Sequence, residues 1–520
     1  MKPLTLIFNS YRTNLFVASV TAFGITSLWF WLTWRWGFDL ADEGYYWYGA
    51  QRVLQGEVPL RDFMSYDIGR YYWTAAFMYF IGDDGIFAAR VGAAIYQALG
   101  ILLGVFICLL ALQREGAVQW LFALLVACTL TFWIRPYYKV YDHVTCIIVI
   151  SLLVLILKTT KPSAWLFAGI CLGIAAIMGR NHGTYGIAAF IFVISVIFIK
   201  APSRQAITGL CGYFVLGVLL GFSPTLIMML AVDGFMVTFL DSIIFIFKHG
   251  ATNIPLPIPW PWSVETGGTD FLLTVQKLAI GIGFVFLLAF PLVGILLLAF
   301  SKFDLSSDAQ KVFVATVATA IPYMHYAFSR ADVTHLALGI FPAMIGLLAV
   351  GGLIKGPRPL MLAISLFAIS FVTVPPKALH AFIKNDWIKT DIAGEQVWIE
   401  PNLSEKLRLI TNELQESPIG SSKFLALPNM PSIHAIFRTR MAIWEIYSLF
   451  PRDRDFEAQE IRRMESAVPE LILLSNHALD GNPKFRYSNM HPLTYEWITS
   501  KYELSHSIKI PEIEVYSLRH

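Results

Sequence analysis

The stretch DLADEGYYWYGAQRVLQGEVPLRDFMSYDIGR, residues 39–70, decides how the rest of the chain is interpreted. It follows the first apolar segment and is rich in acids, arginines and tyrosines. Charges beside a membrane span are costly unless they meet water, a partner or a substrate. The spacing of its residues predicts a short amphipathic helix that begins at Asp42 and Glu43. Asp42 is then either the cap of this helix or a group that performs chemistry at the membrane surface.

The composition excludes an ordinary soluble protein. Of the 520 residues, 56% are hydrophobic and only 14% are charged, which is typical of a polytopic membrane protein. The formal net charge of +3 is too small to indicate nucleic-acid binding. The five cysteines lie in apolar segments without metal-ligand spacing, so they predict no disulfide framework.

About eleven apolar segments are predicted to cross the membrane as helices. They lie near residues 14–34, 86–112, 118–134, 144–158, 164–179, 184–200, 206–230, 271–300, 312–328, 336–354 and 360–374. Residues 71–81 are apolar but too short to cross about 30 Å of hydrocarbon, so we expect them to lie along the interface. The whole loop 37–85 is then on one side of the membrane.

Basic residues give the expected orientation. A basic leader precedes the first span, and short basic connections, for example at Arg114 and Lys158, fall on the same side as that leader. The positive-inside rule makes this side cytoplasmic. With eleven spans, we expect a cytoplasmic N-terminus and an external C-terminus, which would be the periplasmic side if the membrane is the inner membrane of a bacterium.

The connections on the other side mix cations, acids, histidines and aromatic residues. Each loop alone is well explained as solvated surface, but four of them on the side that carries Asp42 indicate a site between span ends. The candidate residues are Lys139, Asp142, His143, Arg180, His182, Arg330, Asp332 and His335. Residues 235–248 are predicted to be a second short interfacial segment. The proline-rich stretch 253–263 is equally well interpreted as a mobile lid and as a stiff spacer.

The composition after about residue 379 is that of a soluble domain. Residues 402–416 are predicted to form an amphipathic helix capped by Asn402, with Glu405 three residues later. Residues 423–428, 470–475 and 513–518 are predicted strands. We expect a compact α/β domain without a nucleotide-binding glycine motif.

The first 115 residues resemble the GT-C glycosyltransferases, in particular the branch of protein O-mannosyltransferases and lipid A aminoarabinose transferases. The resemblance rests on an apolar anchor followed by DEGYY, LQGEVPLRDF, YDIGRYYW and FAARVGAAIY. It implies a GT-C-like transmembrane domain over residues 1–378, with the acidic motif in the external loop 37–85. The external α/β domain over residues 379–520 is predicted from composition and not from the resemblance. Over residues 116–378 the resemblance is limited to topology and the placement of polar loops.

The resemblance also implies an activity. Such enzymes take a sugar from a polyprenyl-phosphate donor and pass it to a glycan, lipid or protein acceptor outside the cytoplasmic membrane. Their aspartate acts as the base, which matches Asp42, and Glu43 would position the acceptor or Asp42. Relatives often have Lys-Pro or Pro-Pro where Gly69-Arg70 stands here, so a role for Arg70 rests on the retained cation.

The residue types support the same chemistry independently. A carboxylate activates the attacking hydroxyl, and arginine or lysine stabilises charge on the departing phosphate. The candidate cations are Arg70, Lys139, Arg180 and Arg330, and the candidate acids that brace them or bind sugar hydroxyls are Asp67, Asp142 and Asp332. A lipid monophosphate offers no diphosphate to chelate, so no obligatory metal or other cofactor is predicted. His143, His182 and His335 leave a divalent metal open, whereas Asp453 and Asp455 are interpreted as solvated charges.

Two other classes of protein remain as alternatives. A flippase or transporter of lipid-linked sugars would act without chemistry, but such proteins place ionisable groups near the membrane midplane. The middles of the predicted spans are almost free of charge, which favours an enzyme. A scaffold with a receptor-like external domain would explain the C-terminal region but not the polar loops.

Overall fold

The computed structural model describes residues 4–200, 204–248, 254–265, 270–300, 305–353, 356–376, 378, 381, 386–416, 423–509 and 512–519. Two compact units can be distinguished in the chain. The first unit comprises Met1–Leu32, Ala93–Met236 and Ile254–Pro376, and the second comprises Thr33–Gly92, Val237–Asn253 and Lys377–His520.

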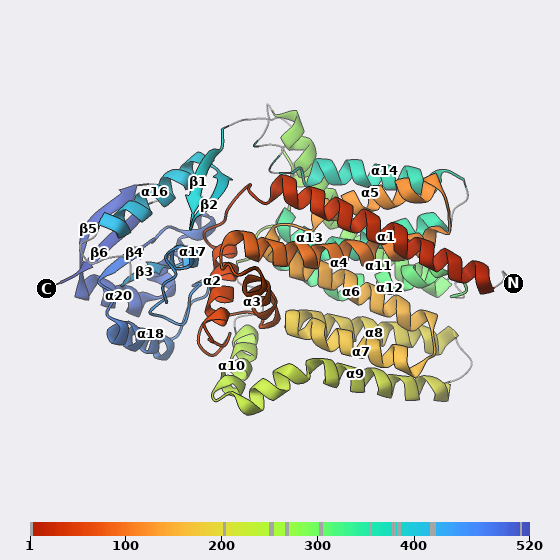
Figure 1. The fold of residues 1–520 in the computed structure, drawn as a ribbon, viewed down its shortest axis with the longest axis horizontal. Helices are drawn as coiled ribbons and strands as arrows, with labels where there is room; N and C mark the ends of the chain where they lie inside the picture. Colours follow the sequence, from red (N-terminus) through yellow and green to blue (C-terminus); the bar gives the residue numbers. More distant parts are fainter. Residues whose placement is uncertain are drawn as a thin grey trace. The chain divides into compact units, whose positions relative to one another are not determined.

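Long apolar helices build the first unit, and Figure 1 shows them running alongside one another. They are α1 (Leu4–Thr33), α4 (Ile86–Leu112), α5 (Ala117–Trp133), α6 (Val140–Lys158), α7 (Pro162–Met178), α8 (Arg180–Lys200), α9 (Arg204–Ala231), α11 (Phe271–Phe300), α12 (Asp308–Ser329), α13 (Val333–Gly352) and α14 (Arg358–Thr373). Helices α1 and α4 continue into the second unit. The prediction of a polytopic helical membrane protein is confirmed.

Eight of the described helices are long and apolar enough to cross a membrane. Every predicted span coincides with a helix, but α5, α7 and α14 have only 16 or 17 residues. Since about 20 residues are needed to cross the hydrocarbon core, the structure supports eight spans by length and composition and does not establish a count of eleven.

Glycines allow α7 and α9 to approach closely. A Cβ atom added to Gly169 would lie 2.1 Å from the carbonyl oxygen of Phe214, and one added to Gly217 would lie 2.2 Å from that of Leu166. Gly173 and Gly221 make equally close approaches one turn further along each helix. Two facing GxxxG patterns therefore hold this helix pair together by close backbone packing.

Both short apolar segments are helices: α3 (Gly69–Ile81) and α10 (Phe235–Lys248). Their exposed faces carry large apolar side chains, including Tyr79, Phe80 and Phe247, each at least 75% exposed. Exposed apolar side chains of this size agree with a location along the membrane interface, which stays a prediction. The described part of the proline-rich stretch ends in η2 (Pro261–Ser263) and lies so close to α11 that a Cβ atom on Gly281 would be 2.5 Å from the carbonyl oxygen of Pro259. That packing favours a fixed spacer over a mobile lid.

All the strands that the structure describes lie in the second unit. β3 (Phe424–Leu427), β4 (Leu471–Leu474), β6 (Glu512–Leu518) and β5 (Tyr502–Lys509) form a sheet in that order, in which only β3 and β4 are parallel. The hairpin β1 (Ile388–Ile392) and β2 (Glu395–Ile399) is separate. The helices are α2 (Asp42–Leu54), α3, α16 (Pro401–Glu416), α17 (Pro431–Phe437), α18 (Arg454–Ala467), α19 (Tyr487–Met490) and α20 (Pro492–Lys501), with turns η3 (Leu479–Gly481) and η4 (Pro483–Phe485).

The C-terminal α/β prediction is confirmed in its main elements. The three predicted strands are β3, β4 and β6, and the predicted helix is α16. The cap is wrong, because Pro401 begins the helix and Glu405 forms a salt bridge with Arg408 at 2.6 Å. Asp453, interpreted from the sequence as a solvated charge, caps α18 by accepting a hydrogen bond from the backbone of Phe456.

Residues 33–92 fold together with the C-terminal region. Backbone hydrogen bonds join Trp398 to Arg35 at 2.7 Å and to Gly37 at 2.8 Å. In α2, the hydroxyl of Tyr48 accepts a hydrogen bond from the backbone of Met441 at 2.9 Å. The loop that we assigned to the transmembrane domain thus shares a compact unit with the C-terminal residues. The expected boundary at Leu379 lies outside the described residues.

Candidate active site

Asp42 is the first residue of α2 but does not cap the helix. That function belongs to Asp39, whose Oδ1 accepts hydrogen bonds from the backbone of Ala41 at 2.9 Å and of Asp42 at 2.7 Å. Burial and the neighbouring carboxylate of Asp42 raise the pKa of Asp39. The capping interpretation of Asp42 is therefore wrong, and its half-buried side chain is available for another function.

The hydroxyl of Tyr447 donates a hydrogen bond of 2.6 Å to Oδ1 of Asp42. Tyr447 stacks on Tyr45 with ring centroids 5.0 Å apart, and Tyr45 meets Tyr66 edge-on at 5.5 Å and Tyr71 at 6.1 Å. Burial raises the pKa of all four phenols, and the charge of Asp42 raises that of Tyr447 further. They remain protonated at neutral pH and form an aromatic wall with hydroxyl donors beside Asp42.

Glu43 forms a buried ion pair with Arg90. The guanidinium contacts both carboxylate oxygens, at 2.7 and 2.8 Å, and also donates to the backbone carbonyls of Trp34 and Gly37. Glu43 is 5% and Arg90 2% exposed. With both oxygens engaged, Glu43 is not placed to hold an acceptor, and we assign it a structural function at the start of α2.

Arg70 and Asp67 are close partners at the start of α3. The guanidinium donates to Oδ2 of Asp67 at 3.0 Å, and both side chains are largely buried. Burial raises the pKa of Tyr45 and of Tyr71, and the positive charge of Arg70 opposes part of this rise. Asp67 therefore braces this cation beside the aromatic wall, as the sequence suggested.

The first unit contains a separate polar cluster. Nε2 of His182 lies 3.2 Å from Oδ1 of Asp142, and Nδ1 of the same ring lies 2.8 Å from the hydroxyl of Tyr323. Tyr185 makes a hydrogen bond of 2.7 Å to Nδ1 of His325. Residues from α6, α8 and α12, far apart in sequence, thus converge on one polar cluster, in which His182, Asp142 and Tyr323 are buried and His325 is exposed.

Arg330, Asp332 and His335 form the second part of this cluster. Nε of Arg330 donates to Oδ2 of Asp332 at 3.0 Å, and Oδ1 of Asp332 accepts from the backbone of His335 at 2.8 Å as the N-cap of α13. Burial opposes ionisation of Asp332, yet bonds from His335 and the charge of Lys139 hold its pKa below its usual range. Arg330 also donates to the carbonyl of Ile254 at 3.2 Å, so its guanidinium is fixed in direction.

His143 lies between the two parts. It is fully buried against Phe341, within electrostatic reach of Lys139, Asp142, His182 and His335. Neither ring nitrogen has a hydrogen-bond partner in the part of the chain that the structure describes. Arg180 begins α8, where its carbonyl accepts from the hydroxyl of Thr184.

The candidate residues therefore fall into two groups, each described within its own unit. The group in the second unit is Asp42, Glu43, Asp67 and Arg70, and the group in the first unit is Lys139, Asp142, His143, Arg180, His182, Arg330, Asp332 and His335. Among the residues that the structure describes, no three histidine, cysteine or acidic side chains form a group that could hold a metal ion. The prediction about metals remains untested.

Sequence reasoning missed several participants. Arg90 could have been predicted, because a charged residue inside a predicted span is expected to have a functional or structural partner. Tyr323 and Tyr447 could not have been predicted, since each is a tyrosine among apolar residues without a recognisable motif.

The second unit also contains a cavity of about 730 Å³. Its lining combines apolar and small side chains with charged and polar ones, namely Asp62, Arg440, Gln459, Arg462 and Arg463, and with Trp444. Arg440 and Arg463 are already paired with Glu57 and Glu460. This volume is in the range of small-molecule sites, and arginine forks suit anionic or hydroxyl-rich groups.

No protein family matches the chain, and no curated protein sequence matches it. Among solved structures, ArnT from Cupriavidus metallidurans in the apo state aligns over 96% of this chain and 97% of that chain, with 13% identity and a TM-score of 0.47. The Archaeoglobus fulgidus oligosaccharyltransferase in the apo form aligns over 98% of this chain and 74% of that chain, with 12% identity and a TM-score of 0.43. These scores establish no residue correspondence and no shared substrate, so the proposals below rest on the geometry of this chain.

Proposed function

We propose that this chain is a membrane glycosyltransferase that moves a sugar from a polyprenyl-phosphate donor to an acceptor on the external face of the bacterial inner membrane, with inversion. The proposal is carried by Asp42, a half-buried carboxylate that is not used as a helix cap and is held by one phenol. A carboxylate kept in place without being neutralised by a cation suits a general base.

Asp42 would take the proton of the acceptor hydroxyl as that oxygen attacks the anomeric carbon. The bond from this carbon to the phosphate oxygen breaks at the same time, and polyprenyl phosphate leaves. A single displacement inverts the anomeric configuration. Tyr447 occupies Oδ1 of Asp42, and within the described residues Oδ2 accepts no hydrogen bond. We assign Oδ2 to the acceptor.

Charge on the departing phosphate needs cations. Within the second unit we propose Arg70 for this function, because its guanidinium is held in place by Asp67. Within the first unit, Arg330 is held by Asp332 in the same way and is proposed as a donor-binding cation there. Lys139 adds charge near Asp332. We propose that the acceptor approaches through the cavity whose wall includes Trp444, three residues before Tyr447.

The transporter alternative is less well supported. Asp142 and His143 lie in the first turn of α6, and His182 lies in the first turn of α8. Ionisable groups at helix ends suit a site built on one face of a membrane domain better than a carrier site at the midplane.

Asp42→Asn tests the proposal. The substitution keeps shape and removes the basic charge, so transfer from a synthetic polyprenyl-phosphate sugar should fall by roughly 10²-fold or more. Donor binding and thermal stability should be unchanged. Asp453→Asn is the matched control, because asparagine caps a helix as well as aspartate does. Normal turnover of Asp42→Asn, or movement of the donor across liposomes without sugar transfer, contradicts the proposal.

A further inference from the structure

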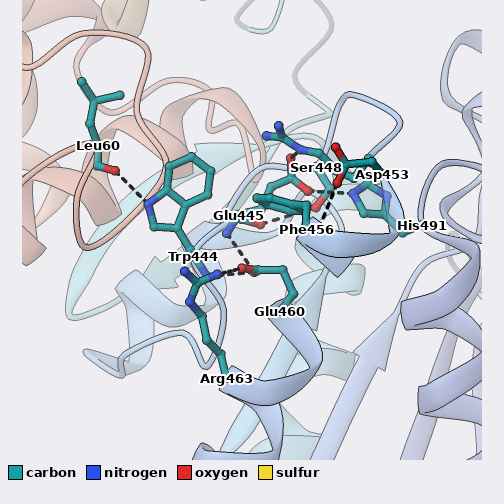
Figure 2. A network of polar contacts seen from close by, with 10 residues as sticks. Leu60, Trp444, Glu445, Ser448, Asp453, Phe456, Glu460, Arg463 and His491 are labelled. Atoms are coloured by element: carbon teal, nitrogen blue, oxygen red, sulfur yellow. Dashed lines mark hydrogen bonds and ion pairs between the residues drawn. The ribbon is translucent and has the colours of Figure 1, made fainter. Parts of the chain in front are cut away.

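The segment that carries Tyr447 is irregular but strongly held. It runs from Arg438 to Asp453, between α17 and α18, without a helix or strand. An irregular segment presents a side chain in one position only if other contacts fix its backbone. Figure 2 shows the polar network that does so.

Glu460 of α18 holds the first part of the segment. Its Oε2 accepts hydrogen bonds from the backbone of Trp444 at 2.9 Å and of Glu445 at 3.2 Å, and its Oε1 pairs with Arg463. The indole of Trp444 donates to the carbonyl of Leu60 at 2.9 Å, as Figure 2 shows. The backbone of Trp444 is thereby fixed three residues before Tyr447.

Glu445 holds the second part. This carboxylate is 1% exposed and binds Nε of Arg452 at 2.5 Å and Nε2 of His491 at 2.7 Å. The guanidinium of Arg452 lies over the rings of Phe245 and Phe456, 4.0 and 4.3 Å from their centroids. Cation–π contacts on two rings restrain the arginine further. Tyr447 therefore lies between two anchored points of the chain.

We infer that Tyr447 is a positioning residue, which fixes one oxygen of Asp42 so that the other faces the acceptor hydroxyl. This inference rests on the proposed function and adds to it a residue 405 positions away in the chain. The phenol is 7% exposed and its ring is locked against Tyr45. Its hydroxyl cannot follow Asp42 if the carboxylate rotates, so the hydrogen bond restricts the carboxylate to one orientation.

The step that benefits is proton transfer. Misplacement of a catalytic group by about 1 Å costs on the order of 10²-fold in rate. Tyr447→Phe keeps the stacked ring and removes only the hydroxyl. We expect kcat to fall about 10- to 100-fold, while KM for donor and for acceptor changes less than about 2-fold.

Tyr516→Phe is the matched control. Its hydroxyl also donates to a carboxylate, Glu514, at 2.9 Å, in the same unit but on β6. This variant should keep wild-type kcat. Should Tyr447→Phe fold poorly, Tyr447→Gln, which keeps a donor, should turn over faster than Tyr447→Leu. Equal rates for those two variants overturn the inference.

The outcomes separate this inference from the proposed function. An inactive Asp42→Asn together with a Tyr447→Phe of normal kcat overturns the positioning role alone. A rise of both KM values at constant kcat also overturns it, because that pattern belongs to altered binding. An active Asp42→Asn removes the proposed function itself.

Discussion

Glu43→Gln should reduce stability, whereas Asp42→Asn should reduce turnover, so the two variants distinguish the functions of the two adjacent acids. Arg90 donates from Nε and Nη2 to Glu43, from Nη2 also to the carbonyl of Gly37, and from Nη1 to the carbonyl of Trp34. A glutamine can accept only one of the two bonds and turns its own N–H groups toward the guanidinium. The cation is left 2% exposed without a counter-charge.

The expected cost follows from that geometry. Removing one partner of a buried ion pair costs about 3–5 kcal/mol. For a unit of this size, that lowers the midpoint of thermal unfolding by roughly 6–20 °C. Replacing both partners, as in Glu43→Leu with Arg90→Met, should restore much of the loss because no buried charge remains.

The assay compares purified Glu43→Gln, the double variant and Asp42→Asn in one detergent. We expect a lower unfolding midpoint but nearly normal turnover per folded molecule for Glu43→Gln, and the reverse for Asp42→Asn. A wild-type midpoint for Glu43→Gln would refute the ion-pair reasoning. Such a midpoint combined with lost turnover would return Glu43 to a function at the acceptor.

Three further outcomes are expected. Arg330→Lys should weaken donor binding by roughly 10-fold without changing acceptor affinity, since the paired fork geometry is lost; equal donor titrations would remove Arg330 from the site. Burial lowers the pKa of His434 to about 3, so the unfolded chain binds a proton that the folded chain refuses, and stability should decrease as pH falls from about 6.5 toward 3; His434→Gln should flatten this dependence of the unfolding midpoint on pH. A cysteine at Thr160 should be shielded from an impermeant thiol reagent in intact cells and one at Lys484 should be labelled, and the reverse result would invert the orientation.

Much of the fold could be predicted because apolar runs encode helices locally. Helix α6 contains an uninterrupted apolar run, and in α16 the apolar residues recur at helical spacing on one face. Strand β5 was missed because its letters YELSHSIK alternate polar and apolar residues only weakly. The union of residues 33–92 with the C-terminal region was also missed. Its contacts, such as that of Tyr48 with Met441, join residues 393 positions apart. The periodicity of a sequence predicts local structure and does not predict which distant residues make contact.

The site was predictable only where residue types cluster along the chain. Arg330 and Asp332 lie two positions apart, and their ion pair forms in extended backbone as expected. His182 and Asp142 were nominated separately as loop residues, and the fold brings them together. Tyr447 could not be nominated, because its function exists only once Asp42 lies against it.

The pairing of Asp42 with Tyr447 has a consequence for how the protein is made. The carboxylate leaves the ribosome 405 residues before the phenol that holds it. At synthesis rates of about 5–20 residues per second, this interval is roughly 20–80 s. During that time the nascent chain already carries its acidic loop but not the partner that orients it. A chain that ended before Tyr447 would therefore lack the phenol that orients the carboxylate, so the proposed activity requires synthesis of the C-terminal region as well as of the acidic loop.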